Sequence, residues 1–188
     1  MMYDDVYLSG KCLVTMPDMQ DEIFKNSVIY ICSHNSNGAV GFVVNKQIQE
    51  LSFADLALRL ALPNANHLAQ INLYQGGPLE KVRGFVLHST DYVKADTVLI
   101  DAKMAISSSI DILNDISFGI GPEDNLIALG YTSWAPKQLD MEVLSNRWMI
   151  VEPNKDLIFR TRDEDKWQRA MDELGVNMAN LSPRAGLA

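Results

Sequence analysis

Two residues with reactive side chains lie close together in a run rich in β-branched residues. Cys32 and His34 are two positions apart in the stretch Val-Ile-Tyr-Ile-Cys-Ser-His. Residues i and i+2 of a regular strand share a face, so this histidine would favour the thiolate and make the cysteine nucleophilic or redox-sensitive. Such neighbours lie roughly 6–7 Å apart, beyond hydrogen-bonding reach. The favoured interpretation is therefore a small buried side chain at Cys32 and a turn residue at His34.

Two other groups of polar and aromatic residues are candidates for a binding cleft. Arg83 and His88 flank Gly84-Phe85-Val86-Leu87, a spacing that places them on opposite faces of a regular strand unless Gly84 forms a bulge. Around a predicted helix, two indoles and two amides lie close in sequence, at Trp134, Gln138, Asn146 and Trp148. These side chains would either line a pocket or pack in the core with their N–H groups satisfied, and the second alternative is favoured.

Familiar catalytic motifs do not fit. Gly130-Tyr-Thr-Ser133-Trp134 lacks the second glycine of a nucleophile elbow. Gly119-Ile-Gly121-Pro122 follows a predicted helix and precedes a predicted strand, the wrong context for a phosphate-binding loop. The two cysteines and three histidines show no metal-site spacing. The sequence therefore predicts no catalytic set, no metal and no cofactor.

The bulk properties are those of an ordinary globular chain. It has 188 residues, 47% hydrophobic and 21% charged, with a formal net charge of −8. That charge disfavours nucleic acid, because phosphate binding needs a basic patch. The acidic Asp4 and Asp5 disfavour a signal peptide, and no apolar run approaches the ~18 residues of a membrane span. We expect a reduced, cytoplasmic protein away from membranes, with an unknown protein or small-molecule partner; the oligomeric state stays open.

The stretch from Asn26 to Lys46 predicts the centre of the fold. Two β-branched and aromatic runs flank Asn37-Gly38, a strong hairpin signal. Both runs carry apolar residues in both alternation phases, which predicts a hairpin in mid-sheet with packing on each face.

The rest of the sequence predicts helices interspersed with strands. Helices are expected at Ser52–Leu62, with Ser52 as cap, at Ser109–Phe118, at Pro136–Leu144, and in a last segment opened by a Thr161-x-x-Glu164 capping box. Late strands are expected at Arg147–Val151 and Leu157–Arg160. The prediction is an α/β (mixed α+β) fold: one domain over residues 1–176, a mixed sheet with the hairpin central and helices on both faces, and a loosely attached tail at 177–188.

Taken in order, the motifs resemble the YqgE/AlgH family of uncharacterised bacterial proteins. The residues that carry this resemblance are Met16–Asp21, Ser27–Asn45, Gly76-Gly77-Pro78, Arg83–His88, Gly130-Tyr131, Trp134, Gln138-Leu139 and Asn146-x-Trp148. The resemblance implies a single-domain cytosolic α/β protein with a large, unusually connected sheet and no established reaction, cofactor or substrate. One branch of the family is linked to transcriptional control of alginate production, which implies a transcriptional regulator.

The chain also departs from the family pattern. Ser133 and Lys137 stand where the family usually has glycine, Asp140 where it has Glu, and Leu187 where it has His. Lost glycines near the third helix would weaken any binding that needs close backbone approach.

Three functions compete. The preferred hypothesis is a non-enzymatic cytoplasmic regulatory or binding protein. The first alternative is a thiol-dependent enzyme or redox-responsive protein that uses Cys32. The second is a DNA-binding transcriptional regulator, which the missing basic helix disfavours. The candidate cleft residues are Cys32, His34, Arg83, His88, Trp134 and Gln138.

Overall fold

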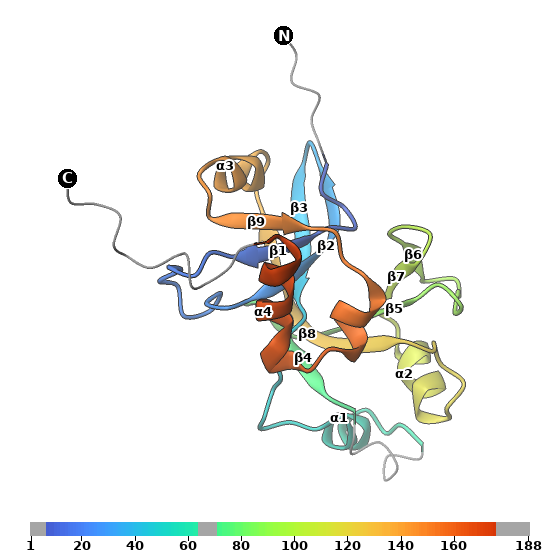
Figure 1. Ribbon diagram of the computed structural model, residues 1–188. Helices are drawn as coiled ribbons and strands as arrows, with labels where there is room; N and C mark the ends of the chain where they lie inside the picture. Colours follow the sequence, from blue (N-terminus) through green and yellow to red (C-terminus); the bar gives the residue numbers. More distant parts are fainter. Residues whose placement is uncertain (1–6, 64–70, 176–188) are drawn as a thin grey trace, which may run out of the picture.

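Within residues 7–63 and 71–175, which the computed structural model describes, nine strands form one bent sheet (Figure 1). Its order is β6-β7-β5-β8-β3-β2-β1-β9, and β4 pairs with β8 away from this path. All neighbours are antiparallel except β4 and β8, so the sheet is mixed, as predicted. The strands are β1 Cys12–Thr15, β2 Val28–Asn35, β3 Gly38–Val43, β4 Leu73–Gln75, β5 Leu79–Ser89, β6 Val98–Leu99, β7 Met104–Ser107, β8 Asn125–Trp134 and β9 Trp148–Val151.

The predicted hairpin is confirmed at the middle of this sheet. β2 and β3 pair from Ile29–Val43 to Asn35–Gly38, and β1 and β8 flank them. Tyr30 and Phe42 are buried on one face, and Ile29 and Val43 on the other. The apolar residues of both alternation phases are therefore used, because both faces of the hairpin are covered.

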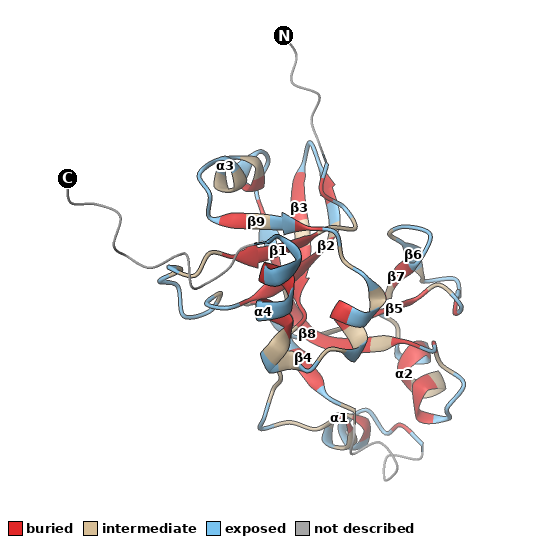
Figure 2. Ribbon diagram, viewed as in Figure 1, coloured by how far each residue is buried: buried red, intermediate tan, exposed pale blue. Residues whose placement is uncertain are grey.

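Helices cover both faces, as predicted. On one face, α4 (Asp163–Glu173) packs Trp167, Ala170 and Met171 against the hairpin and β1. On the other, α3 (Gln138–Leu144) covers the hairpin end, while α1 (Phe53–Arg59) and α2 (Ile110–Ser117) cover β5 and β8. Figure 1 shows α3 and the α1–α2 pair at opposite ends of the sheet, and Figure 2 shows the buried residues concentrated along the strands between them.

The start of α1 follows the prediction and the start of α4 does not. Ser52 and Asp55 form a reciprocal capping box at α1. At α4 the N-cap is Arg162, with no side-chain cap, and Thr161 Oγ1 instead donates to the carbonyl of Asp156 at 2.8 Å. The capping-box prediction was wrong there because the Thr161 hydroxyl bonds to the preceding turn and not to a backbone amide of α4.

The predicted strand Leu157–Arg160 was also wrong. Residues Asp156–Arg160 form a π-helical turn, closed by the Thr161 amide donating to the Asp156 carbonyl at 2.7 Å. Leu157 and Ile158 are buried in the core cluster on the face of the sheet that α4 covers. A short apolar run fits a buried helical turn as well as a strand, and here the packing decides.

The chain that follows β4 passes β8 at a point where a side chain would not fit. Gly130 has φ of +75°, and a Cβ there would lie 2.8 Å from the Gly77 carbonyl oxygen. Glycine permits both the backbone angle and the close approach. The predicted boundary at residue 176, the tail at 177–188 and Leu187 lie outside the described residues.

Candidate functional site

A hollow of about 260 Å³ lies beside α3, and we call it the α3 cleft. Its lining includes Asp21, Phe24, Trp134, Gln138, Glu142 and Trp148. β8 ends at Trp134, α3 carries Gln138 and Glu142, and β9 begins at Trp148, so three consecutive elements build it. The structure thus brings together two of the six sequence candidates, Trp134 and Gln138, with the second predicted indole.

One carboxylate organises this cleft. Glu142 Oε2 accepts hydrogen bonds from the indole N–H groups of Trp134 at 2.9 Å and Trp148 at 2.7 Å. Its Oε1 accepts from the Gln138 amide at 2.9 Å. Burial acts to raise the pKa of Glu142, but these donors, together with Arg147, lower it overall. Glu142 is therefore held as an anion whose acceptor sites are occupied, a poor arrangement for a general base.

The sequence predicted the two indoles but missed Glu142. The signal that could have found it is helical spacing, because Glu142 follows Gln138 by four positions and so shares its helix face. Both indole N–H groups have an acceptor in Glu142, and the same rings also line the cleft, so the two alternatives do not exclude each other here.

His34 lies against the other side of α3. Its Nδ1 accepts a hydrogen bond from the Leu8 amide at 3.1 Å, and its Nε2 lies 3.6 Å from Asp140 Oδ1. The ring is buried, with Tyr7 packed edge-on at 5.5 Å between centroids. His34 therefore lies between the segment before β1, which donates to its Nδ1, and the carboxylate of Asp140 on α3.

Cys32 does not share a face with His34, and that prediction was wrong. The β2–β3 register shifts between Ile31 and Ser33, which makes Cys32 the extra residue of a β-bulge. The half-buried Cys32 packs against the cluster under α4, whereas His34 lies on the side of α3. Burial, with a smaller contribution from Cys12, raises the pKa of the Cys32 thiol well above its usual value. That disfavours the thiolate that nucleophilic chemistry requires.

Arg83 and His88 lie apart from the α3 cleft and from each other. Arg83 is exposed, stacks 5.1 Å from the Phe85 ring centroid and pairs with Glu80 at 3.2 Å. His88 is fully buried, and burial lowers its pKa. Its Nδ1 lies 2.9 Å from the Ser89 carbonyl, so Nδ1 carries the proton and Nε2 accepts from the Ser107 hydroxyl at 3.1 Å. The six candidates do not share one cleft.

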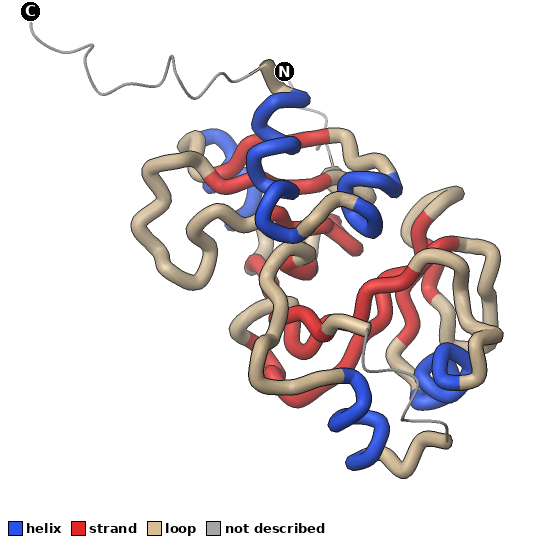
Figure 3. Tube along the Cα trace, turned by 60° about the horizontal axis from the view of Figure 1, so that its bottom comes forward, coloured by secondary structure: helices blue, strands red, loops and turns tan. Residues whose placement is uncertain are grey.

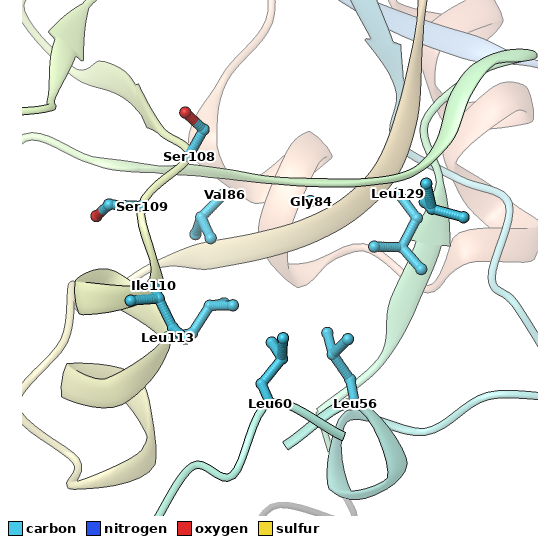
Figure 4. A pocket seen from close by; sticks show the side chains of 10 residues that line it. Leu56, Leu60, Gly84, Val86, Ser108, Ser109, Ile110, Leu113 and Leu129 are labelled. Carbon is cyan, nitrogen blue, oxygen red and sulfur yellow. The ribbon is translucent and has the colours of Figure 1, made fainter. Parts of the chain in front are cut away.

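A second hollow, which the sequence did not reveal, lies between α1 and α2 (Figure 4). Figure 3 shows the backbone of these two helices at one end of the molecule. This apolar groove has a volume of about 200 Å³. Gly84, Val86 and Leu129 of β5 and β8 form its floor, and the side chains that face each other across it in Figure 4 are Leu56, Leu60, Ile110 and Leu113.

Apolar side chains at the edge of the groove are open to solvent. Val82 is 96% exposed, Ile110 47% and Leu60 38%. An apolar surface that continues from a groove onto its rim is typical of an interaction site.

Over residues 7–63 and 71–175, no group of three histidine, cysteine or acidic side chains is arranged to hold a metal ion. In the same ranges, no helix is long and apolar enough to cross a membrane.

The sequence over residues 12–179 matches the family model described as AlgH-like. The chain belongs to the AlgH-like family. An uncharacterised UPF0301 protein of Rhodospirillum rubrum is 41% identical over 97% of this chain and 95% of its own, and one from Cereibacter sphaeroides is 41% identical over 96% and 99%. The solution structure of AlgH from Pseudomonas aeruginosa, 36% identical, superposes with a TM-score of 0.80 over the whole of both chains. A crystal structure from Corynebacterium diphtheriae, 18% identical over 95% of each chain, shares the fold with a TM-score of 0.72.

One departure from the AlgH-like pattern has a visible structural cost. Lys137, at the position where the family resemblance predicts glycine, precedes α3 with φ of 63°. A left-handed conformation costs a residue with a Cβ roughly 1–2 kcal/mol relative to glycine. Ser133, the other replaced glycine, lies in β8 and is not left-handed, so its substitution carries no such strain.

Proposed function

We propose that this AlgH-like chain is a non-enzymatic cytoplasmic binding protein of the regulatory kind. Its recognition surface is the apolar groove, and the occupant is an apolar segment of a partner protein. The observation that carries this proposal is the groove together with its exposed rim at Val82, Ile110 and Leu60.

The size of the groove favours a protein partner over a cofactor or metabolite. Small-molecule sites typically enclose ~300–1,000 Å³. A groove of about 200 Å³ suits one or two inserted apolar side chains. The exposed rim would then be covered by the segment that carries those side chains, as at the centre of ordinary protein interfaces.

The placement of the reactive groups supports binding rather than catalysis. Cys32 and His34 lie on opposite sides of the sheet. His88 is buried, and its ring nitrogens are used in hydrogen bonds within the protein. Glu142 already accepts three hydrogen bonds from Trp134, Gln138 and Trp148. The net charge of −8 also supports a protein partner over DNA.

Site-specific photo-crosslinking in living cells tests this proposal. A benzoylphenylalanine in place of Val82 should give a discrete adduct with a protein. The matched control replaces Leu144, another largely exposed aliphatic residue, which is 77% exposed at the end of α3. An adduct at 82 that is absent at 144 supports the groove. No adduct at 82, or the same adducts at both positions, would contradict it.

A further inference from the structure

A third hollow lies on the side of the sheet away from the apolar groove's rim, between three chain segments. The residues that line it come from the approach to β1 (residues 9–11), the β6–β7 turn (residues 101–104) and the segment after β9 (residues 152–155 and 158). Its volume of about 350 Å³ falls within the range of small-molecule sites. We call it the lysine cleft, after Lys11, Lys103 and Lys155, one from each segment.

The acidic groups of the lysine cleft are already engaged. Asp101 Oδ1 accepts the backbone amides of Lys103 at 2.6 Å and Met104 at 2.9 Å, and its Oδ2 accepts the Tyr30 hydroxyl at 3.3 Å. Glu152, the other carboxylate in the lining, pairs with Lys11. These carboxylates are used in hydrogen bonds and an ion pair within the protein, so they leave little free negative charge for a bound cation.

Among the residues that line the cleft, lysines outnumber carboxylates. Three lysines line it against two carboxylates, in a chain whose net charge is −8. Lys155 lies 3.2 Å from Asp124 Oδ2, while the other oxygen of that carboxylate faces Arg160 at 3.3 Å, and Arg160 also pairs with Asp156 at 2.9 Å. Across the described ranges, Lys103 has no ion-pair partner. An ammonium group free of ion pairs at the wall of a concave site is suited to hold an anionic oxygen.

The backbone beside the cleft is specialised. The π-helical turn Asp156–Arg160 begins directly after Lys155, and the Asn154 side chain accepts the Leu157 amide at 2.8 Å. Single π-helical turns are uncommon and frequently occur at functional sites. Burial of Leu157 and Ile158 fixes this turn, and with it the position of Lys155 at the cleft wall.

We propose that the lysine cleft binds a small oxyanion with two or more negative charges, held between Lys103 and Lys155. The chemistry is shared by phosphate esters and by small polycarboxylates. This site is separate from the apolar groove and does not depend on the proposed function.

Calorimetric titration of the full chain tests the proposal, with inorganic phosphate and citrate as probes at ionic strength held constant with sodium chloride. We expect saturable binding of at least one probe, with the Gly10 and Met104 amides shifted in a ¹H–¹⁵N spectrum. Phosphate without citrate indicates a phosphate ester as the natural ligand, and citrate without phosphate indicates a polycarboxylate. Failure of both probes to saturate would overturn the site.

Charge variants localise the binding. Lys103→Met removes an exposed lysine and should weaken the probe about tenfold, the usual loss for one charge-assisted hydrogen bond. The matched control is Lys81→Met, an exposed lysine that lines a different hollow, and it should change affinity less than twofold. Lys155→Arg keeps the charge and should retain binding. Equal weakening by Lys103→Met and Lys81→Met would mean a general charge effect and would overturn the proposal.

Discussion

The α3 cleft and the apolar groove lie on the same side of the sheet and are built in opposite ways. In the cleft, every prominent polar group has a partner within the protein, and Glu142 alone accepts from two indoles and one amide. In the groove, aliphatic side chains face each other across a hollow and Val82 remains almost fully exposed. The cleft is thus complete without a ligand, whereas the groove gains from being covered. The polar and aromatic residues that the sequence singles out are therefore those whose hydrogen bonds stabilise the fold.

The largest effect should come from the centre of the cleft. Glu142→Ala leaves two buried indole donors and one amide without an acceptor, so it should lower the free energy of unfolding by about 3 kcal/mol. Urea denaturation measures this loss. The control is Glu164→Ala, a surface carboxylate paired only with Arg162, which should cost at most about 0.5 kcal/mol. A loss below 1 kcal/mol at Glu142 would mean that the cleft is less self-contained than its contacts indicate.

The same carboxylate should make the cleft sensitive to acid. The pKa of Glu142 is lowered from its usual 4.5 in the folded state, so it contributes stability above that pH and loses it as the pH falls through the folded value. Wild type should therefore be more stable than Glu142→Gln at neutral pH, and the difference should narrow below about pH 4.5. Urea denaturation across this range gives the comparison; a difference that stays constant with pH would be incompatible with a native anion.

Reactivity of Cys32 sharpens the contrast between engaged and available groups. Because burial raises the pKa of this thiol, alkylation by iodoacetamide at pH 7.5 should be at least about tenfold slower than for a free cysteine. Mass spectrometry of the modified peptide follows the rate, and unfolding in urea should restore it. Fast alkylation of the folded chain would revive the thiol-dependent alternative.

A smaller effect is expected where the chain departs from its family. Lys137→Gly should raise the free energy of unfolding by about 1 kcal/mol, because it removes the strain of a left-handed lysine before α3. The matched control is Ser133→Gly at the other replaced glycine, which lies in β8 and should give no gain. Equal effects of the two substitutions would show that the backbone angle is not the cause.

The outline of the fold could be predicted because its signals are local. Asn37-Gly38, the double-phase apolar runs and the Ser52–Asp55 capping box each act within a few residues, and each is confirmed. The bulge at Cys32 could not be predicted, since it depends on how β2 aligns with β3.

The groove depends on contacts distant in sequence, whereas the donors to Glu142 lie only four to eight residues from it. Glu142 is central to the α3 cleft because it accepts hydrogen bonds from side chains of β8, α3 and β9. The groove combines α1 with α2 and β8, which begin 51 and 66 residues after α1 ends, so no local pattern in the sequence predicts it.

The central claim is that the groove recognises a partner while the α3 cleft holds the fold. The most direct test is the dissociation constant for the protein crosslinked at position 82, measured for wild type, Val82→Lys and Glu142→Gln below their unfolding temperatures. Val82→Lys should unfold within about 0.5 kcal/mol of wild type because the side chain is exposed, yet bind at least about tenfold more weakly. Glu142→Gln should bind within twofold of wild type. The reverse order, with binding lost at Glu142 and kept at Val82, would contradict the account.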